Sequence, residues 1–181
     1  MSFLYPGFYE DAEKRKVYWL PEMHELGKQE RWNDFIDFVA GHYEVMPDAF
    51  NQYFPKMPDE YKRKMVKECY QHNGEYYPEC VEAIINLPCN GVNELPSNYA
   101  NKEVIAVYRG DYADALEDDI EFAPSWTLSI DVARFFRNRK GENGKVYKGY
   151  ISPSDVIAYI DDREEKEVIQ FGSVYSVEII E

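Results

Sequence analysis

The chain of 181 residues has no long apolar run and no sign of a cleaved leader. A membrane-spanning helix needs about 18 or more consecutive apolar residues, and no such run is present. The first residues, MSFLYPGFYEDAEKRK, carry their charges after the apolar start and lack the apolar core of a signal peptide. We therefore expect no membrane association. We expect a cytoplasmic protein, or one delivered into a target cell by another route.

Cysteine and histidine are both scarce, with three residues of each. Cys69, Cys80 and Cys89 form no C-x-x-C pair, and His72 is the one histidine near them in sequence. A structural zinc site needs four ligands at tighter, paired spacing. The sequence therefore predicts no metal, and it predicts buried free thiols in a reducing compartment.

Basic residues are few beside the acidic ones, 20 Lys and Arg against 34 Asp and Glu, so the formal net charge is −14. A phosphate backbone repels such a chain, which argues against nucleic-acid binding. The acidity can simply favour solubility, or it can serve an inhibitor of a basic partner. Residues 1–100 and 101–181 each hold 17 acidic and 10 basic residues, so charge assigns no role to either part.

The first part of the chain, residues 1–98, has the periodicity of helices. One helix is predicted in the segment LGKQERWNDFIDFVAGHY. Its apolar residues form a single stripe, and Gly41 is its expected end. Pro58 and Pro78 are each expected at a helix start, where the missing N–H costs nothing. The residues expected on the buried faces are Leu26, Trp32, Phe35, Ile36 and Val39; Tyr61, Met65 and Cys69; and Val81, Ile84 and Ile85.

The second part, residues 99–181, changes to the period of strands. The segment 87–101, LPCNGVNELPSNYAN, has the composition of a loop and marks the boundary. Apolar and alternating runs then predict four or five strands, in KEVIAVYRG, KVYKGYIS, VIAYI, EKEVIQF and SVYSVEII. One helix is expected in SIDVARFFRNR, capped by Ser129, with Val132, Ala133 and Phe136 on one face. The sequence therefore predicts an α+β fold.

Three short motifs in this second part carry candidate chemistry. Arg109 closes an apolar strand and precedes Gly110, so its planar guanidinium suits a phosphate or carboxylate ligand. Ser125 opens the segment SWTLS, which enters a helix. Glu165 and Glu167 are two residues apart, and on one strand they would share a face about 7 Å apart.

Each motif also has an ordinary structural explanation. An arginine at a strand end can be solvated, SWTLS can be a helix cap with a buried tryptophan, and EEKE can be a solvated charge run. A glycoside hydrolase that uses the two glutamates is a weak alternative, because such pairs usually come from different elements. There is no G-x-G-x-x-G or Walker loop, so a Rossmann or P-loop nucleotide site is not expected.

Taken in order, the three motifs resemble the R-S-E group of mono-ADP-ribosyltransferases, the arginine-specific, binary-toxin-like branch. The resemblance covers residues 102–181, and EKEVI is its most specific element. It implies an ADP-ribosyltransferase-like fold of two small packed sheets, preceded here by a helical region. It also implies an enzyme that transfers ADP-ribose from NAD to a protein acceptor, an arginine, and releases nicotinamide, as phage and bacterial toxins or effectors do. NAD would be the substrate, and an immunity or antitoxin protein is a further partner to expect.

The resemblance also implies a role for individual residues. Arg109 would hold the NAD pyrophosphate or its ribose, and Gly110 would offer backbone groups to the nicotinamide amide. Glu167 would hold the 2′-hydroxyl of the nicotinamide ribose, and Glu165 would position and deprotonate the acceptor guanidinium. The supporting residues would be Ser125, which orients Glu167, Thr127 beside it, Phe136 against nicotinamide and Arg139 near a phosphate.

The sequence departs from the family pattern at Trp126, which separates Ser125 from Thr127 where the family has a contiguous S-T-S. Phe135 competes with Phe136 for the nicotinamide contact, since one of the two is expected to face the core, and Arg137 competes with Arg139. Simple NAD hydrolysis stays open beside transfer. A non-catalytic binding module that kept the fold, or an acidic inhibitor, is the alternative from another functional class.

Overall fold

The computed structural model describes residues 8–72, 74, 77–87, 91–113, 120–161, 163–170 and 172–181. The chain divides into two compact units, Met1–Leu87 and Pro88–Glu181. The division falls within the loop-like segment 87–101. No helix in the described ranges is long and apolar enough to cross a membrane.

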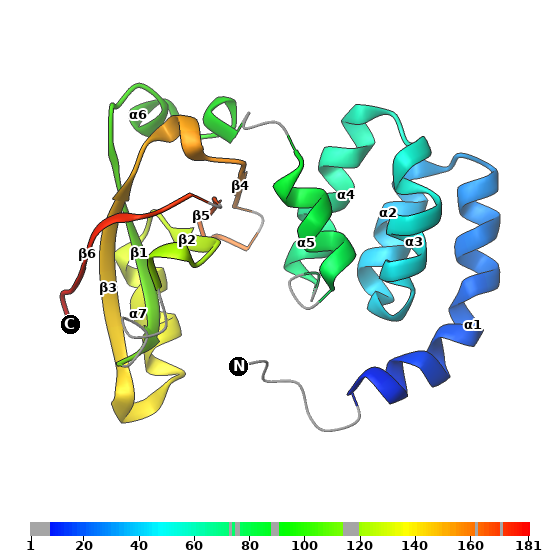
Figure 1. Ribbon diagram of the computed structural model, residues 1–181, viewed down its shortest axis with the longest axis horizontal. Coiled ribbons are helices and arrows are strands. Elements are labelled where there is room, and N and C mark those ends of the chain that lie inside the picture. The colour runs from blue at the N-terminus through cyan, green and yellow to red at the C-terminus, as the bar shows by residue number, and fades with distance from the viewer. Residues whose placement is uncertain are drawn as a thin grey trace. The chain divides into compact units, whose positions relative to one another are not determined.

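The regular secondary structure described in the first unit is all helical (Figure 1). Its buried residues are almost all apolar, with Met23, Phe35 and Met65 fully enclosed. Two ion pairs connect the first helix to the segment that follows the second, Lys16 to Asp48 at 2.8 Å and Arg15 to Glu44 at 3.0 Å. The elements are α1 (Phe8–Lys28), α2 (Trp32–Gly41), α3 (Met46–Gln52), α4 (Asp59–Gln71) and α5 (Pro78–Ile85), with 3-10 turns at Tyr43–Val45 and Phe54–Lys56.

Local signals set most of the helix ends. α2 ends at Gly41, α4 begins directly after Pro58, and α5 begins at Pro78, as the sequence predicts. The single helix expected across residues 26–43 is wrong, however. Glu30 adopts a left-handed backbone with φ of 54°, and this separates α1 from α2.

The buried faces are largely those expected. Most of the expected residues are buried, namely Leu26, Trp32, Phe35, Ile36, Val39, Met65, Cys69 and Ile84. Ile85 is 50% exposed, because Cys80 and Ile84 make the inner face of α5. Tyr61 and Val81 are half-buried. Cys69 and Cys80 are free, buried thiols, as predicted, and Cys89 lies outside the described residues.

The second unit contains a six-stranded antiparallel sheet (Figure 1). Its strand order is β4-β5-β2-β1-β3-β6. The strands are β1 (Ile105–Tyr112), β2 (Ser125–Thr127), β3 (Gly144–Ile151), β4 (Ala158–Ile160), β5 (Glu167–Ile169) and β6 (Tyr175–Ile179). The helices are α6 (Ser97–Ala100) and α7 (Ile130–Asn138), and short 3-10 turns lie at Gly91–Asn93, Ile120–Phe122, Gly141–Asn143 and Pro153–Asp155.

The α+β class is confirmed, but the described strands form one sheet where two small packed sheets were expected. The reason is the pairing of Tyr108 in β1 with Thr127 in β2. This one register pair joins the three-stranded half β4-β5-β2 to the three-stranded half β1-β3-β6. Distant pairings of this kind depend on contacts between segments far apart in the chain, which local periodicity does not encode.

The two faces of the sheet have different neighbours. One face carries a hydrophobic cluster that includes Val107, Trp126, Tyr147 and Val168. The alternation of strand side chains puts these four residues on the same face. On the other face α7 packs closely on β1. A Cβ atom added to Gly110 would lie 2.1 Å from the backbone oxygen of Ala133 and 2.4 Å from the backbone nitrogen of Arg137.

Candidate active site

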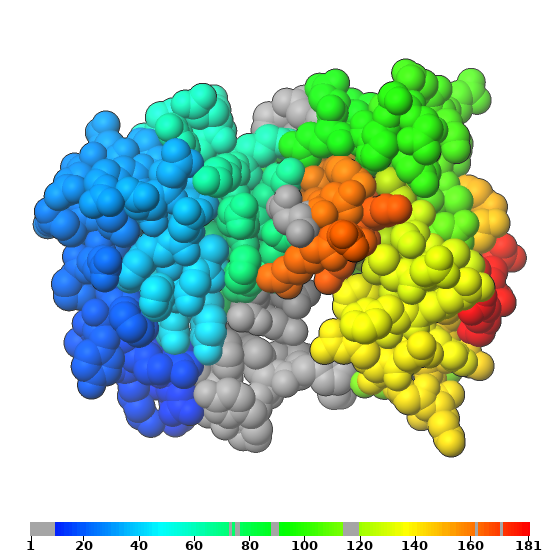
Figure 2. All heavy atoms as spheres, turned by 180° about the vertical axis from the view of Figure 1, so that it is seen from behind, coloured from blue at the N-terminus to red at the C-terminus, as the bar shows by residue number. Residues whose placement is uncertain are grey.

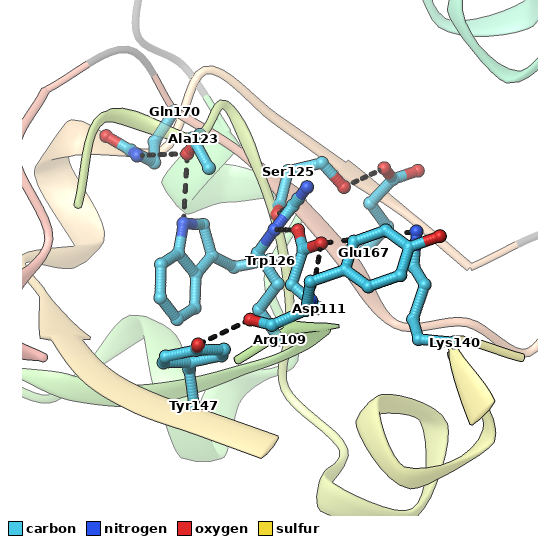
Figure 3. A network of polar contacts seen from close by, with 10 residues as sticks. Arg109, Asp111, Ala123, Ser125, Trp126, Lys140, Tyr147, Glu167 and Gln170 are labelled. Carbon is cyan, nitrogen blue, oxygen red and sulfur yellow. Dashed lines mark hydrogen bonds and ion pairs between the residues drawn. The ribbon is translucent and has the colours of Figure 1, made fainter. Parts of the chain in front are cut away.

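Ser125 and Glu167 meet on neighbouring strands. β2 and β5 pair antiparallel, with Ser125 opposite Ile169 and Thr127 opposite Glu167. The alternation of both strands therefore turns Ser125, Thr127 and Glu167 to one face. Across this pair the Ser125 hydroxyl donates a hydrogen bond to Oε1 of Glu167 (Figure 3). The contact that the sequence analysis expects between these two motifs is thus present.

Trp126 fits between Ser125 and Thr127 by pointing the other way. It is 2% exposed and belongs to the hydrophobic cluster on the opposite face of the sheet. Its indole Nε1 donates to the backbone oxygen of Ala123 at 2.9 Å, just before the strand begins. The tryptophan that interrupts the family pattern is therefore an anchor for β2, and it leaves Ser125 and Thr127 on the same face.

Gln170 is a residue that the sequence analysis missed. Its side chain is fully buried, and its Nε2 donates to the same Ala123 oxygen at 2.9 Å. Its backbone N–H donates to the oxygen of Pro124 at 2.9 Å. A glutamine directly after an apolar strand was the available signal. Gln170 and Trp126 together fix the point where β2 begins and hence the position of Ser125 (Figure 3).

Arg109 reaches Ser125 from the adjacent strand. One terminal nitrogen of its guanidinium donates to the Ser125 backbone oxygen at 2.7 Å, and its Nε donates to Oδ2 of Asp111 at 2.9 Å. Its side chain is 29% exposed. Ser125 is therefore a shared partner, because its carbonyl accepts from Arg109 and its hydroxyl donates to Glu167. Three residues that lie up to 58 positions apart in sequence, 109 to 167, meet there.

Asp111 and Lys140 extend this network and were also missed. Asp111 is two residues after Arg109 on β1, and this Arg-x-Asp spacing was the signal that could have found it. Its Oδ1 accepts from the backbone N–H of Tyr112 at 2.9 Å and lies 4.0 Å from Nζ of Lys140. Lys140 also lies over the Tyr112 ring, 4.6 Å from its centroid. The carboxylate beside Arg109 is thus partly balanced by a second cation.

Glu165 does not lie on a strand with Glu167, which corrects the expected pair of carboxylates on one strand face. β5 begins at Glu167, and both Glu164 and Lys166 have left-handed backbones, with φ of 58° and 49°. Left-handed residues end the extended alternation, so the spacing of two no longer fixes a common face. Glu165 is half-buried in the turn before β5. The backbone oxygen of Glu165 accepts a hydrogen bond from Thr127 Oγ1 at 2.6 Å.

Gly110 has a structural reason to be glycine. The backbone of α7 occupies the position that a side chain would need, so the strand and the helix can approach only in its absence. The contact that the resemblance implies between the Gly110 backbone and nicotinamide stays a prediction.

The end of α7 carries the aromatic and basic candidates. Ser129 caps this helix by accepting from the N–H of Val132, as predicted. Ala133 is the fully buried residue of α7, so neither phenylalanine is fully enclosed. Phe135 is 59% exposed and Phe136 is half-buried.

The two arginines near this end differ in their partners. Arg137 donates through Nε to the backbone oxygen of Gly144 at 3.2 Å and so attaches α7 to β3. Arg139 is exposed, and its guanidinium carbon lies 6.0 Å from the centroids of both phenylalanine rings. Among the described hydrogen bonds, the guanidinium of Arg137 has a backbone acceptor and that of Arg139 has none. Its phosphate contact and the stacking of Phe136 on nicotinamide stay predictions.

Comparison of the chain with protein-family models, with curated proteins and with solved structures finds no match. The described residues contain no group of three or more His, Cys, Asp or Glu side chains that could hold a metal ion. The network around Ser125 is therefore the feature of the described residues that bears on function.

Proposed function

We propose that the protein is an NAD-dependent mono-ADP-ribosyltransferase with an ADP-ribosyltransferase-like second unit, which transfers ADP-ribose to an arginine of a protein acceptor. The observation that carries this proposal is the double use of Ser125, which donates to the Glu167 carboxylate and accepts from Arg109. These are the three residues of the R-S-E pattern, brought into contact from three strands.

In the proposed reaction, Glu167 acts on the ribose. The bond between ribose C1′ and the nicotinamide nitrogen breaks, and its electron pair leaves with nicotinamide. The sugar becomes cationic in the transition state, and a fixed carboxylate beside it stabilises charge that is absent from the ground state. The hydrogen bond from Ser125 holds Glu167 in one orientation. Nicotinamide leaves neutral, so no general acid is needed.

Arg109 has the donors to hold a phosphate while keeping its present contacts. A guanidinium carries five N–H groups, and hydrogen bonds to Asp111 and Ser125 use two of them. The planar fork of the remaining groups suits the pyrophosphate of NAD. Lys140 reduces the repulsion that Asp111 would otherwise exert on that anion.

The acceptor step is assigned to Glu165. A protonated guanidinium is a weak nucleophile, so a carboxylate must hold it near C1′ and take the proton as the new C–N bond forms. Glu165 is suited to this task because it lies in a turn next to the strand that carries Glu167. Water can replace the guanidinium, which gives free ADP-ribose.

The test uses NAD labelled in the adenylate part, with a cell lysate as the source of acceptors. We expect the wild-type protein to release nicotinamide and to label protein, and Glu167→Gln to do neither. Glu165→Gln should still release nicotinamide but label little protein. Glu142→Gln, an exposed glutamate after α7, is the matched control and should behave as wild type.

The binding-module and inhibitor alternatives predict a different result. In those cases the folded wild-type protein releases no nicotinamide, and all four proteins behave alike. That outcome would refute the enzymatic proposal.

A further inference from the structure

The turn before β5 has an unusual backbone. Glu164 and Lys166, on either side of Glu165, both have left-handed φ angles. L-residues adopt this conformation at a cost, so it persists where neighbouring contacts hold the chain. Both residues are exposed, and the segment that leads into this turn reaches the surface (Figure 2, orange). The contacts that hold the turn must therefore come from its inner side.

Thr127 supplies one of these contacts. Its side chain is 6% exposed, and its Oγ1 donates to the Glu165 oxygen while accepting from the N–H of Ser129 at 3.0 Å. The hydroxyl is thus fixed by a donor and an acceptor. Next to it, the N–H of Leu128 donates to the Lys166 oxygen at 3.0 Å. The end of β2 therefore holds two successive carbonyl groups of the turn, those of Glu165 and Lys166.

Asp161 supplies the other contacts. Its Oδ1 accepts from the N–H of Lys166 at 3.1 Å, and its backbone oxygen accepts from the N–H of Glu164 at 3.0 Å. Its Oδ2 accepts from the Tyr159 hydroxyl at 3.0 Å, and Tyr159 is buried in the hydrophobic cluster. Asp161 thus connects the end of β4 to the residues before and after Glu165.

The two glutamates consequently have separate supports. Glu167 is on a strand and is held by Ser125, whereas Glu165 is in a turn held by Thr127 and Asp161. We infer that Asp161 is a positioning residue which, with Thr127, places Glu165 toward the acceptor and so determines how much ADP-ribose passes to a guanidinium rather than to water. This inference rests on the proposed function.

The chemistry explains why the two outcomes separate. In both, the bond from C1′ to nicotinamide breaks first and needs Glu167. A guanidinium nitrogen must then form a bond to C1′ and give its proton to Glu165, which requires that carboxylate at a defined place. Water is small and abundant and needs no such positioning. A displaced turn should therefore lower transfer while nicotinamide release continues.

The experiment measures two products from the same full-length protein, with NAD and agmatine, a small alkyl guanidine, as substrates. Nicotinamide release reports bond cleavage, and ADP-ribosyl-agmatine reports transfer. The variants are Asp161→Ala, Asp161→Asn and the control Asp155→Ala, which removes an aspartate of the same unit outside the turn. We expect Asp161→Ala to release nicotinamide within about twofold of wild type and to lose about tenfold or more in the ratio of transfer to release.

The conservative variant separates positioning from general stability. The Asn side-chain oxygen can still accept from the Lys166 N–H, so Asp161→Asn should keep most of the wild-type ratio. Asp155→Ala should keep all of it. A purely structural role would lower both products together and leave the ratio unchanged. That result, in a variant whose thermal unfolding matches wild type, would overturn the inference.

A second pair of variants covers the case in which Asp161→Ala does not fold. Thr127→Val removes the hydroxyl that holds Glu165 and should lower the ratio, whereas Thr127→Ser keeps the hydroxyl and should preserve it. Equal ratios for Val and Ser would overturn the inference as well. If the wild-type protein itself releases no nicotinamide, the proposed function fails, and that result is distinct from an active enzyme with an unchanged ratio.

Discussion

The site depends on Ser125, because its backbone oxygen accepts from Arg109 and its hydroxyl donates to Glu167. The backbone oxygen would survive a substitution, and the hydroxyl would not. Sequence reasoning could find the serine from the motif. The Arg-x-Asp spacing and the glutamine after an apolar strand mark Asp111 and Gln170 in the sequence, but their hydrogen-bond partners come from the folded chain.

The first prediction concerns the Ser125 hydroxyl. Ser125→Ala leaves the Glu167 carboxylate without its donor, and a hydrogen bond to a charged group contributes roughly 1.5–3 kcal/mol. We expect kcat for nicotinamide release to fall about 10- to 100-fold, with a smaller change in KM for NAD. Steady-state kinetics measure this, with Ser154→Ala as an exposed control. Unchanged kcat would mean that Ser125 does not orient Glu167 for catalysis.

The second prediction concerns the thiols of the helical unit. Burial raises the pKa of Cys80 to about 12, and burial also raises the pKa of Cys69, with smaller contributions from Cys80 and Glu68. The thiolate is the reactive form, so both thiols should be inert at pH 8. In a Cys89→Ser variant, we expect a thiol reagent to react slowly with the folded protein and to titrate both thiols in denaturant. Equal rates in the two conditions would contradict this burial.

At the scale of elements, the packing of α7 on β1 depends on a residue with no side chain. A Cβ at position 110 would come within 2.4 Å or less of two backbone atoms of the helix, and backbone cannot move aside as a flexible side chain can. Gly110→Ala should therefore lower the free energy of unfolding by about 1–3 kcal/mol. Urea unfolding measures this. Gly172→Ala is the control, since its Cβ would meet one atom at an ordinary 3.5 Å. Equal stability of the two variants would contradict the close approach.

Elements that have local signals could be predicted, and those without them could not. Pro58, Pro78, Gly41 and Ser129 mark helix ends because their effects on the backbone act within a few residues. The break between α1 and α2 and the turn around Glu165 depend on left-handed residues that are not glycine. The local sequence does not indicate such left-handed residues, because none of them is a glycine.

The junction of the sheet had even less local signal. The two halves of the sheet meet at Tyr108 and Thr127, 19 positions apart, and nothing in either segment specifies that register. The candidate site depends on this junction, because β1 carries Arg109 and β2 carries Ser125. The motifs could therefore be found in the sequence, and the resemblance implied the contact between Ser125 and Glu167, but the strand register that produces these contacts could not be predicted.

At the scale of the whole molecule, alkaline pH should destabilise the fold. Burial and the hydrogen bond to Asp161 raise the pKa of Tyr159 to about 12, whereas an unfolded tyrosine titrates near 10. Between these values the folded state keeps a proton that the unfolded chain has lost. The free energy of unfolding therefore falls as pH rises through that range, and the contribution of Tyr159 is fully present below about pH 10.

The corresponding test compares wild type with Tyr159→Phe, in urea unfolding at several pH values from 8 to about 12. As pH rises, the buried thiols and Lys16 also lower the free energy of unfolding, and they do so alike in both proteins. Burial raises the pKa of the thiols, and the hydrogen bond to Asp48 raises the pKa of Lys16. We expect a shallower decline above pH 10 for Tyr159→Phe. Parallel curves would show that Tyr159 titrates alike in the folded and unfolded states.

We propose that Glu167, held by Ser125, stabilises the ribose cation as the bond between ribose and nicotinamide in NAD breaks. The most direct measurement is the release of labelled nicotinamide from NAD by the purified wild-type protein and by Glu167→Gln, each shown to be folded by circular dichroism. We expect sustained release by wild type and a loss of at least about 100-fold in Glu167→Gln. Release by neither protein, or equal release by both, would contradict it.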